Sequence, residues 1–128
     1  RGAQKLLDRF ERSKAAMQLA QIRVLGGAMK RVPNTATAFG QRDAEILVGF
    51  IALDPDPGMQ KQNEKWVEAA VADLGGNSRP GYVNFLTQDR GDAVQRAYGK
   101  ENWQRLMAIK QAYDPSNLFS RNHNIATA

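Results

Sequence analysis

The sequence of 128 residues has no cysteine and a single histidine, His123. Without cysteine, disulfides, thiolate metal sites and a cysteine nucleophile are excluded. One histidine and no Glu-x-x-His pattern give no cluster of metal ligands, so we expect no metal site. The sequence also lacks a Gly-x-Ser-x-Gly elbow, a phosphate-binding loop and the glycine pattern of dinucleotide sites. Hydrolase and nucleotide-kinase functions therefore have no support.

Long apolar runs are missing as well. No segment approaches the ~18 apolar residues of a membrane span, and the chain opens with charged residues. The net charge is +5 and the isoelectric point is about 9.8, but acidic residues lie among the basic ones, as on solvated helix faces. We expect a soluble protein, cytoplasmic or secreted, with no membrane and no nucleic acid among its partners.

Several segments have the spacing of amphipathic helices. Residues 2–15, 60–74 and 102–113 carry apolar side chains at intervals of three and four, and a short helix is expected at 92–98. Trp66 lies among valines on the apolar stripe of the second segment. At that spacing a tryptophan is expected in the core rather than at a ligand site.

Other segments have strand patterns. The nearly continuous apolar run in residues 44–53 predicts a central strand covered on both faces. A Gly-Gly pair between residues 18–25 and 28–32 predicts a hairpin turn or a bulge, and 82–86 is expected to be a short strand. The order of elements indicates an α+β fold: a largely antiparallel sheet with helices packed on one face.

The last sixteen residues carry the most information. The ring of Pro115 disfavours the α conformation of the preceding residue, so the last helix must end near Tyr113. In an extended segment, the side chains of Asn122 and Asn124 would project from one face. Two carboxamides suit a flat ligand with ring N–H and carbonyl groups, because each offers donors and an acceptor. His123 between them is expected to be exposed or hydrogen-bonded rather than catalytic.

The segment around Tyr82 is ambiguous when judged by spacing alone. On a strand, Tyr82 and Asn84 share one face, while Val83 and Phe85 share the other. This spacing favours a core strand with Tyr82 at its rim over a ligand site.

Three blocks of sequence together match a known family pattern. From the C-terminus they are Tyr113-Asp114-Pro115-Ser116-Asn117-Leu118-Phe119 with Asn122, Asn124 and Ile125; Gly81-Tyr82-Val83-Asn84-Phe85-Leu86 with Ala97-Tyr98-Gly99; and Gly26-Gly27-Ala28 with Arg42-Asp43-Ala44. They closely resemble the berberine bridge enzyme-like FAD-linked oxidases of the vanillyl-alcohol oxidase superfamily. The resemblance covers roughly residues 20–126, and its final block is the most specific.

The resemblance implies the C-terminal part of an FAD-dependent oxidoreductase, which oxidises a substrate C–H by hydride transfer to the flavin with O₂ as acceptor. It divides the chain into a partial substrate-binding domain, residues 1–112, and a flavin-facing C-terminal segment, residues 113–128, that returns toward a missing FAD domain. The implied partners are the FAD-binding domain of the same protein and a small-molecule substrate. The isolated chain begins at Arg1 and is expected to be an inactive, colourless fragment.

The resemblance also implies roles for individual residues. Asn84, Asn122 and Asn124 would bind FAD, and Tyr82 and Phe85 would form the active-site wall. Many members have a second tyrosine where this chain has Phe85, and in some of them that hydroxyl serves as the catalytic base. Because phenylalanine cannot take a proton, the catalytic residue stays unassigned.

A second departure from the family is Gln41, at a position where bacterial members often carry histidine. We assign it no function. Two alternatives remain open: a non-catalytic α+β binding module whose basic surface meets an acidic partner, and a domain that serves only as a dimerisation surface. Weak, steeply salt-dependent retention on nucleic acid by a flavin-free monomer would favour the binding module.

Overall fold

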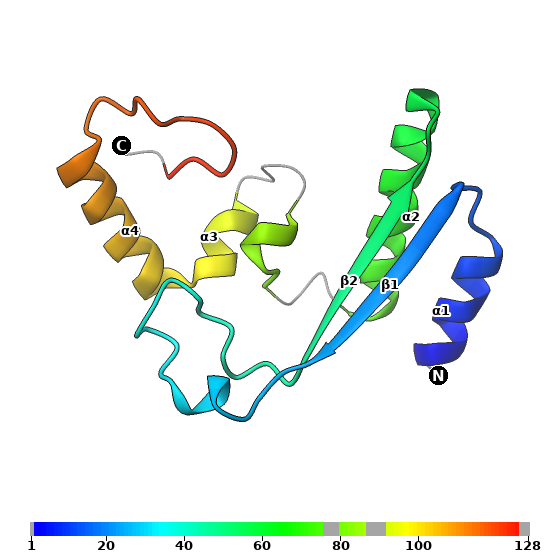
Figure 1. Ribbon diagram of the computed structural model, residues 1–128, viewed down its shortest axis with the longest axis horizontal. Coiled ribbons are helices and arrows are strands. Elements are labelled where there is room, and N and C mark those ends of the chain that lie inside the picture. The colour runs from blue at the N-terminus through cyan, green and yellow to red at the C-terminus, as the bar shows by residue number, and fades with distance from the viewer. Residues whose placement is uncertain (1, 76–79, 87–91, 126–128) are drawn as a thin grey trace. The chain divides into compact units, whose positions relative to one another are not determined.

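The computed structural model describes residues 2–75, 80–86 and 92–125. The chain forms two units, each with its own packing (Figure 1). The first unit comprises Arg1–Val24 and Ile46–Arg79, and the second comprises Leu25–Glu45 and Pro80–Ala128. The family blocks around residues 82 and 122 thus belong to the same unit. The domain boundary expected at residue 113 stays a prediction.

The sheet of the first unit consists of two antiparallel strands, β1 (Met17–Val24) and β2 (Ile46–Leu53), paired over all 8 residues of each. No other sheet occurs in the described part of the chain. Residues 28–32 are not a strand: they contain a 3₁₀ turn at Met29–Arg31. The Gly-Gly pair before it adopts positive φ, which glycine tolerates, and so forms a turn out of β1 rather than a hairpin.

Two helices pack on one face of this sheet. They are α1 (Gly2–Glu11) and α2 (Gln60–Asp73). The ring of Trp66 in α2 lies edge-on to Phe10 of α1, with centroids 5.2 Å apart, and to Phe50 of β2, at 6.3 Å. The prediction of an α+β fold, with an antiparallel sheet and helices on one face, is therefore confirmed, and Trp66 is a packing residue.

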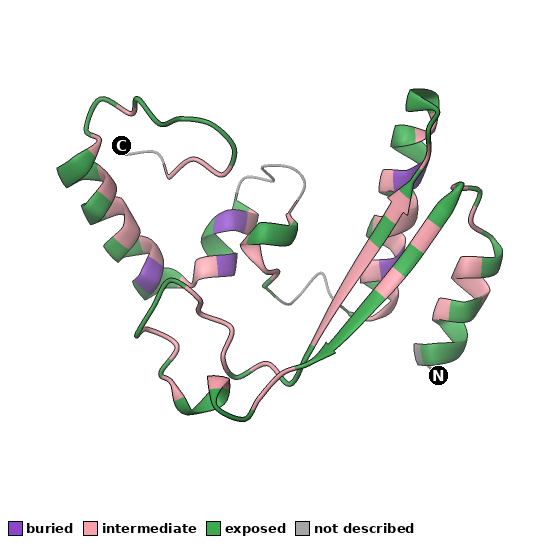
Figure 2. Cartoon of the chain, in the orientation of Figure 1, coloured by how far each residue is buried: buried purple, intermediate pink, exposed green. Residues whose placement is uncertain are grey.

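The other face of the sheet is uncovered in the described residues. Four large apolar side chains of this face are exposed, Met17 by 52%, Leu19 by 46%, Ile51 by 41% and Leu53 by 52%, whereas Leu47 is half-buried. Figure 2 shows the exposed colour along much of β1. The prediction that residues 44–53 are covered on both faces is wrong for this chain. An apolar run shows that both faces of the strand are apolar, but it does not show that another element covers each face.

The second unit contains α3 (Asp92–Tyr98) and α4 (Lys100–Tyr113), separated by Gly99 at φ +78°. Residues 82–86 do not form a strand. Val83–Phe85 is a 3₁₀ turn, in which the amide of Phe85 donates to the carbonyl of Tyr82 at 2.9 Å. This local bond satisfies the backbone where no partner strand is present among the described residues.

Polar side chains hold a long loop of the second unit onto its helices. The buried amide of Asn102 donates to the Asn34 carbonyl at 3.0 Å, and Gln41 donates to the Ala97 carbonyl at 2.9 Å. The loop also approaches α3 closely, since a Cβ on Gly40 would lie 2.7 Å from a backbone oxygen. Gln41, which the sequence left without a role, is therefore a structural contact.

The described residues contain neither a membrane-spanning helix nor a group of metal-binding side chains. None of the described helices combines the length and the apolar character that crossing a membrane requires. Within the same residues, no three His, Cys, Asp or Glu side chains are grouped so that they could hold a metal ion.

Candidate functional site

Tyr82 lies at the centre of a row of aromatic rings in the second unit. Its ring is edge-on to Phe39, with centroids 5.5 Å apart, and to Phe85, at 5.3 Å. The guanidinium of Arg42 lies 5.5 Å from the centroid of Phe39. Because side chains three residues apart eclipse in a 3₁₀ turn, Tyr82 and Phe85 come together, although a strand would place them on opposite faces.

Asn84 lies on the exposed side of this turn. Its Nδ2 donates to the hydroxyl of Tyr82 at 2.8 Å. The phenol oxygen is therefore held by a neighbour in the same turn. The expected role of Asn84 in flavin binding stays a prediction.

His123 joins the C-terminal segment to the turn. Its Nε2 lies 3.0 Å from the carbonyl oxygen of Leu86. Because a carbonyl only accepts, His123 must carry a proton on Nε2. No local pattern in the sequence indicates this contact between residues that are 37 positions apart.

Two acceptor atoms beside this contact are buried without a partner. They are Nδ1 of His123 and Oδ1 of Asn124, for which the described residues offer no hydrogen-bond donor. A buried polar atom left unpaired costs about 1–3 kcal/mol. A ligand with N–H or O–H donors could satisfy these unpaired acceptors of two consecutive residues.

The two asparagines of the terminal motif do not lie on one extended face. Asn122 is exposed and has a φ of +57°, and its carbonyl accepts from the amide of Asn124 at 2.9 Å. The expected extended segment is therefore wrong here. Asparagine tolerates the left-handed conformation, so the chain turns at Asn122 and only Asn124 points inward.

Asp114 organises the loop that follows α4. Its carboxylate accepts from the amides of Leu118 at 2.7 Å and Phe119 at 3.0 Å, and it forms an ion pair with Lys110. The hydrogen bond from Lys110 and those from the two amides lower the pKa of Asp114 below its ordinary value, against an opposing effect of burial. These contacts of Asp114 therefore fix the conformation of the loop between α4 and His123.

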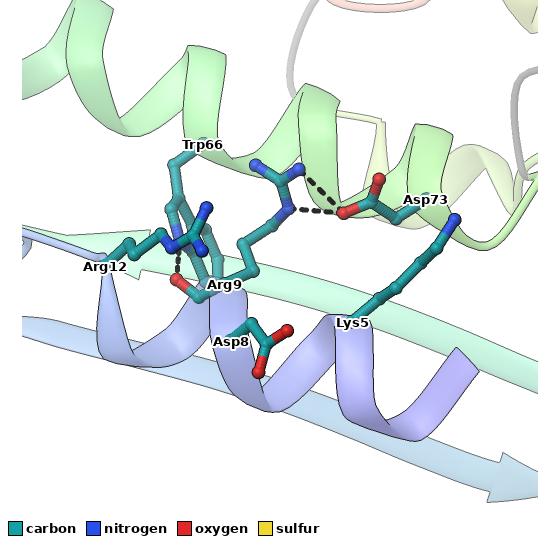
Figure 3. A pocket seen from close by; sticks show the side chains of 6 residues that line it. All are labelled: Lys5, Asp8, Arg9, Arg12, Trp66 and Asp73. Carbon is teal, nitrogen blue, oxygen red and sulfur yellow. Dashed lines mark hydrogen bonds and ion pairs between the residues drawn. The ribbon is translucent and has the colours of Figure 1, made fainter. Parts of the chain in front are cut away.

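A pocket of about 290 Å³ lies in the first unit, between α1 and α2 (Figure 3). Arg9 forms an ion pair with Asp73 in it at 2.6 Å, and its carbonyl accepts from the indole N–H of Trp66 at 3.0 Å. The complete lining is Lys5, Asp8, Arg9, Arg12, Trp66 and Asp73. None of the site residues predicted from the sequence lines this pocket.

Comparisons with known proteins match part of the second unit to a family model and most of the chain to individual relatives. Residues 81–126 match the family model described as berberine and berberine like. The chain is 36% identical over 101 residues to the uncharacterized FAD-linked oxidoreductase YgaK of Bacillus subtilis, covering 79% of this chain and 22% of that protein. It is 29% identical over 143 residues to berberine bridge enzyme-like 6 of Arabidopsis thaliana, covering 98% and 26%.

A third relative is the aclacinomycin-N/aclacinomycin-A oxidase of Streptomyces galilaeus, at 30% identity over 112 residues, covering 73% of this chain and 21% of that enzyme. The chain thus spans about a quarter or less of the length of these relatives. With the family blocks present and joined in one unit, the chain belongs to the berberine bridge enzyme-like family of FAD-linked oxidoreductases.

Proposed function

We propose that the chain is the C-terminal part of an FAD-dependent oxidase that transfers hydride from a substrate C–H to the flavin, with O₂ as the final acceptor. Its partners are the FAD-binding domain of the same protein and a small-molecule substrate. The observation that carries the proposal is the contact between His123 and the Leu86 carbonyl. It brings the terminal motif beside the Tyr82 turn, as one composite site would require.

The chemistry of the site fits FAD. The buried acceptors of His123 and Asn124 have no donor among the described residues, and a flavin cofactor offers a ring N–H and ribityl hydroxyls. Asn124 would hold the cofactor through its Oδ1, with Asn84 and Asn122 contributing amide groups. When bound, FAD supplies the hydride acceptor and its reoxidation by O₂.

The side chains of the turn have separable roles toward a substrate. Tyr82 and Phe85 contact each other and offer a mainly apolar wall that excludes water. Of these two, only Tyr82 carries a hydroxyl that can hold or release a proton, and Asn84 orients that hydroxyl. Phe85 cannot act as a base, so any base other than Tyr82 would come from the part of the oxidase outside these residues.

Substitutions in the full-length oxidase test this assignment. Asn124→Ala and Asn84→Ala should lower the flavin content of the purified protein or its rate of reduction, because each removes an amide that we assign to the cofactor. Gln104→Ala, an exposed position on α4, serves as the control and should change neither quantity. If flavin content and turnover were unchanged in both asparagine variants, neither residue would belong to the site.

A further inference from the structure

The pocket between α1 and α2 has a positively charged wall. Lys5 and Arg9 lie on α1, and Arg12 directly follows the last residue of that helix. Their spacing of four and three residues places them on one face, and Figure 3 shows all three side chains reaching toward α2. The lining also contains two carboxylates, those of Asp8 and Asp73, so the three cations leave one positive charge in excess. The pocket therefore favours an anion.

The two carboxylates of the pocket already have donors. Oδ2 of Asp73 accepts from Nε of Arg9 at 2.7 Å and lies 2.6 Å from Nη2 of the same side chain, and Asp8 accepts from the amide of Gln4 at 2.8 Å. The side chains of Arg9 and Asp73 are only 27% and 25% exposed. A guanidinium carries five N–H donors, so the ion pair fixes Arg9 and leaves its Nη1 available to a ligand.

The cations on either side of Arg9 lack a counter-ion in the structure. Neither Lys5 nor Arg12 has a hydrogen bond or an ion pair within residues 2–75, 80–86 and 92–125. Both residues are exposed, so their long side chains can adjust to a ligand. The pocket thus combines one fixed donor with two mobile positive charges.

The size and charge of the pocket indicate the kind of anion. A volume of about 290 Å³ is close to the smallest that commonly holds an organic ligand. The indole N–H of Trp66 already donates to the Arg9 carbonyl at 3.0 Å, so its ring offers apolar contact in the wall. Two unpaired cations match a phosphate monoester, which carries about −1.5 to −2 charges at pH 7. A single carboxylate would leave one cation without a counter-ion.

We propose that this pocket binds a small organic phosphate, a monoester whose oxygens contact Lys5, Arg9 and Arg12 and whose apolar part lies against Trp66. Arginine and lysine are the usual ligands of phosphate oxygens in proteins. All these residues belong to the first unit, whereas every residue assigned to the cofactor belongs to the second. The phosphate site is therefore independent of the proposed function.

Calorimetric titration of the full-length oxidase with phenyl phosphate tests this site. Lys5→Gln combined with Arg12→Gln should raise the dissociation constant at least about tenfold, because charged hydrogen bonds to the phosphate are lost. Lys61→Gln combined with Lys65→Gln is the matched control. It removes the same charge from two exposed positions of α2, four residues apart, that do not line the pocket. It should leave the dissociation constant nearly unchanged.

A stability measurement checks the same site in a second way. A ligand that binds only the folded state raises the melting temperature. Phenyl phosphate should therefore raise the melting temperature of the wild type and of the Lys61 and Lys65 control. It should not raise that of the variant lacking Lys5 and Arg12.

Four results would overturn the proposal. The first is the absence of saturable binding to the wild type, and the second is an equal loss of affinity in the control variant, which would reflect net charge alone. Succinate binding as tightly as phenyl phosphate would show that the site does not select phosphate. Inorganic phosphate binding as tightly would show that the ring of Trp66 contributes nothing.

Discussion

The contacts within the first unit differ in kind from those within the second. In the first unit, Trp66 packs between Phe10 of one helix and Phe50 of the sheet. In the second unit, side-chain amides bind backbone carbonyls across long stretches of sequence, as Asn102 and Gln41 do. Both units combine the two kinds of contact, but the long loop of the second unit is held by specific donors and acceptors, whereas the helices of the first unit pack on its sheet through apolar rings.

This difference concerns how strictly the contacts of each unit constrain its sequence. Helix–sheet packing tolerates apolar replacements of similar volume. A loop held by a side chain needs one donor or acceptor at one position, as Asp114 provides for the loop after α4. The family model matches residues 81–126, all within the second unit, while the Bacillus and Arabidopsis relatives match 79% and 98% of the chain.

Replacing Trp66 should have the largest effect on stability and should act on the first unit. Trp66→Ala removes both ring contacts and the bond to the Arg9 carbonyl. We expect a loss of about 3 kcal/mol, the low end for tryptophan, because the side chain is only half-buried. Trp66→Phe should cost less, about 1–2 kcal/mol, because it keeps an aromatic ring but loses the hydrogen bond and part of the ring volume. Hydrogen exchange would localise the change, and equal loss of protection in both units would show that they do not unfold separately.

A pair of glycine substitutions gives the next largest difference and compares the units directly. At Gly40, in the second unit, a Cβ would lie 2.7 Å from the carbonyl oxygen of Tyr98, whereas at Gly49, in the first, it would meet nothing within 4 Å. We expect Gly40→Ala to destabilise by about 2 kcal/mol and Gly49→Ala to change stability by less than about 0.5 kcal/mol. Urea unfolding of both variants measures these changes in stability. Similar losses for the two variants would contradict the close approach of the Tyr98 carbonyl to Gly40.

The periodic parts of the fold could be predicted from the sequence. Helical spacing gave residues 60–74 and 92–98, close to the observed Gln60–Asp73 and Asp92–Tyr98. The strand predicted at 82–86 failed because five residues contain too little alternation to distinguish a strand from a 3₁₀ turn. What covers a strand could not be predicted either, because apolarity does not identify the covering element.

The candidate site was predictable in part. Sequence blocks named Tyr82 and Phe85, and the structure brings their rings together. The contact of His123 with Leu86 had no local signal, because it joins residues that are distant along the chain. The turn at Asn122 escaped prediction because asparagine is compatible with both extended and left-handed backbone.

A charge substitution in the second unit should have a smaller, local and pH-dependent effect. The pKa of Asp114 is lower in the folded chain than its ordinary value of 3.8, chiefly because Lys110 donates to it. Its stabilising contribution is therefore complete above that value and is lost as the pH falls through the lower folded pKa. Asp114→Asn should speed hydrogen exchange at the Leu118 and Phe119 amides at neutral pH.

This difference between wild type and Asp114→Asn should shrink as the pH is lowered below about 4. Asp56→Asn is the matched control, because its carboxylate also accepts a backbone amide, that of Gly58 at 2.8 Å, but in the first unit. It should leave the exchange of the Leu118 and Phe119 amides unchanged at every pH. A difference at Asp114 that did not vary with pH would contradict the role of its charge.

The smallest effect should come from the uncovered face of the first unit. Ile51 is 41% exposed there, opposite the helix-covered face. Ile51→Thr keeps a β-branched side chain suited to a strand, so the isolated chain should change in stability by less than about 0.5 kcal/mol. A loss above about 1 kcal/mol in urea unfolding would show that this face is covered in solution. The sheet of the first unit would then have apolar packing on both faces, and the first unit would differ even more from the second, whose loops are held by hydrogen bonds.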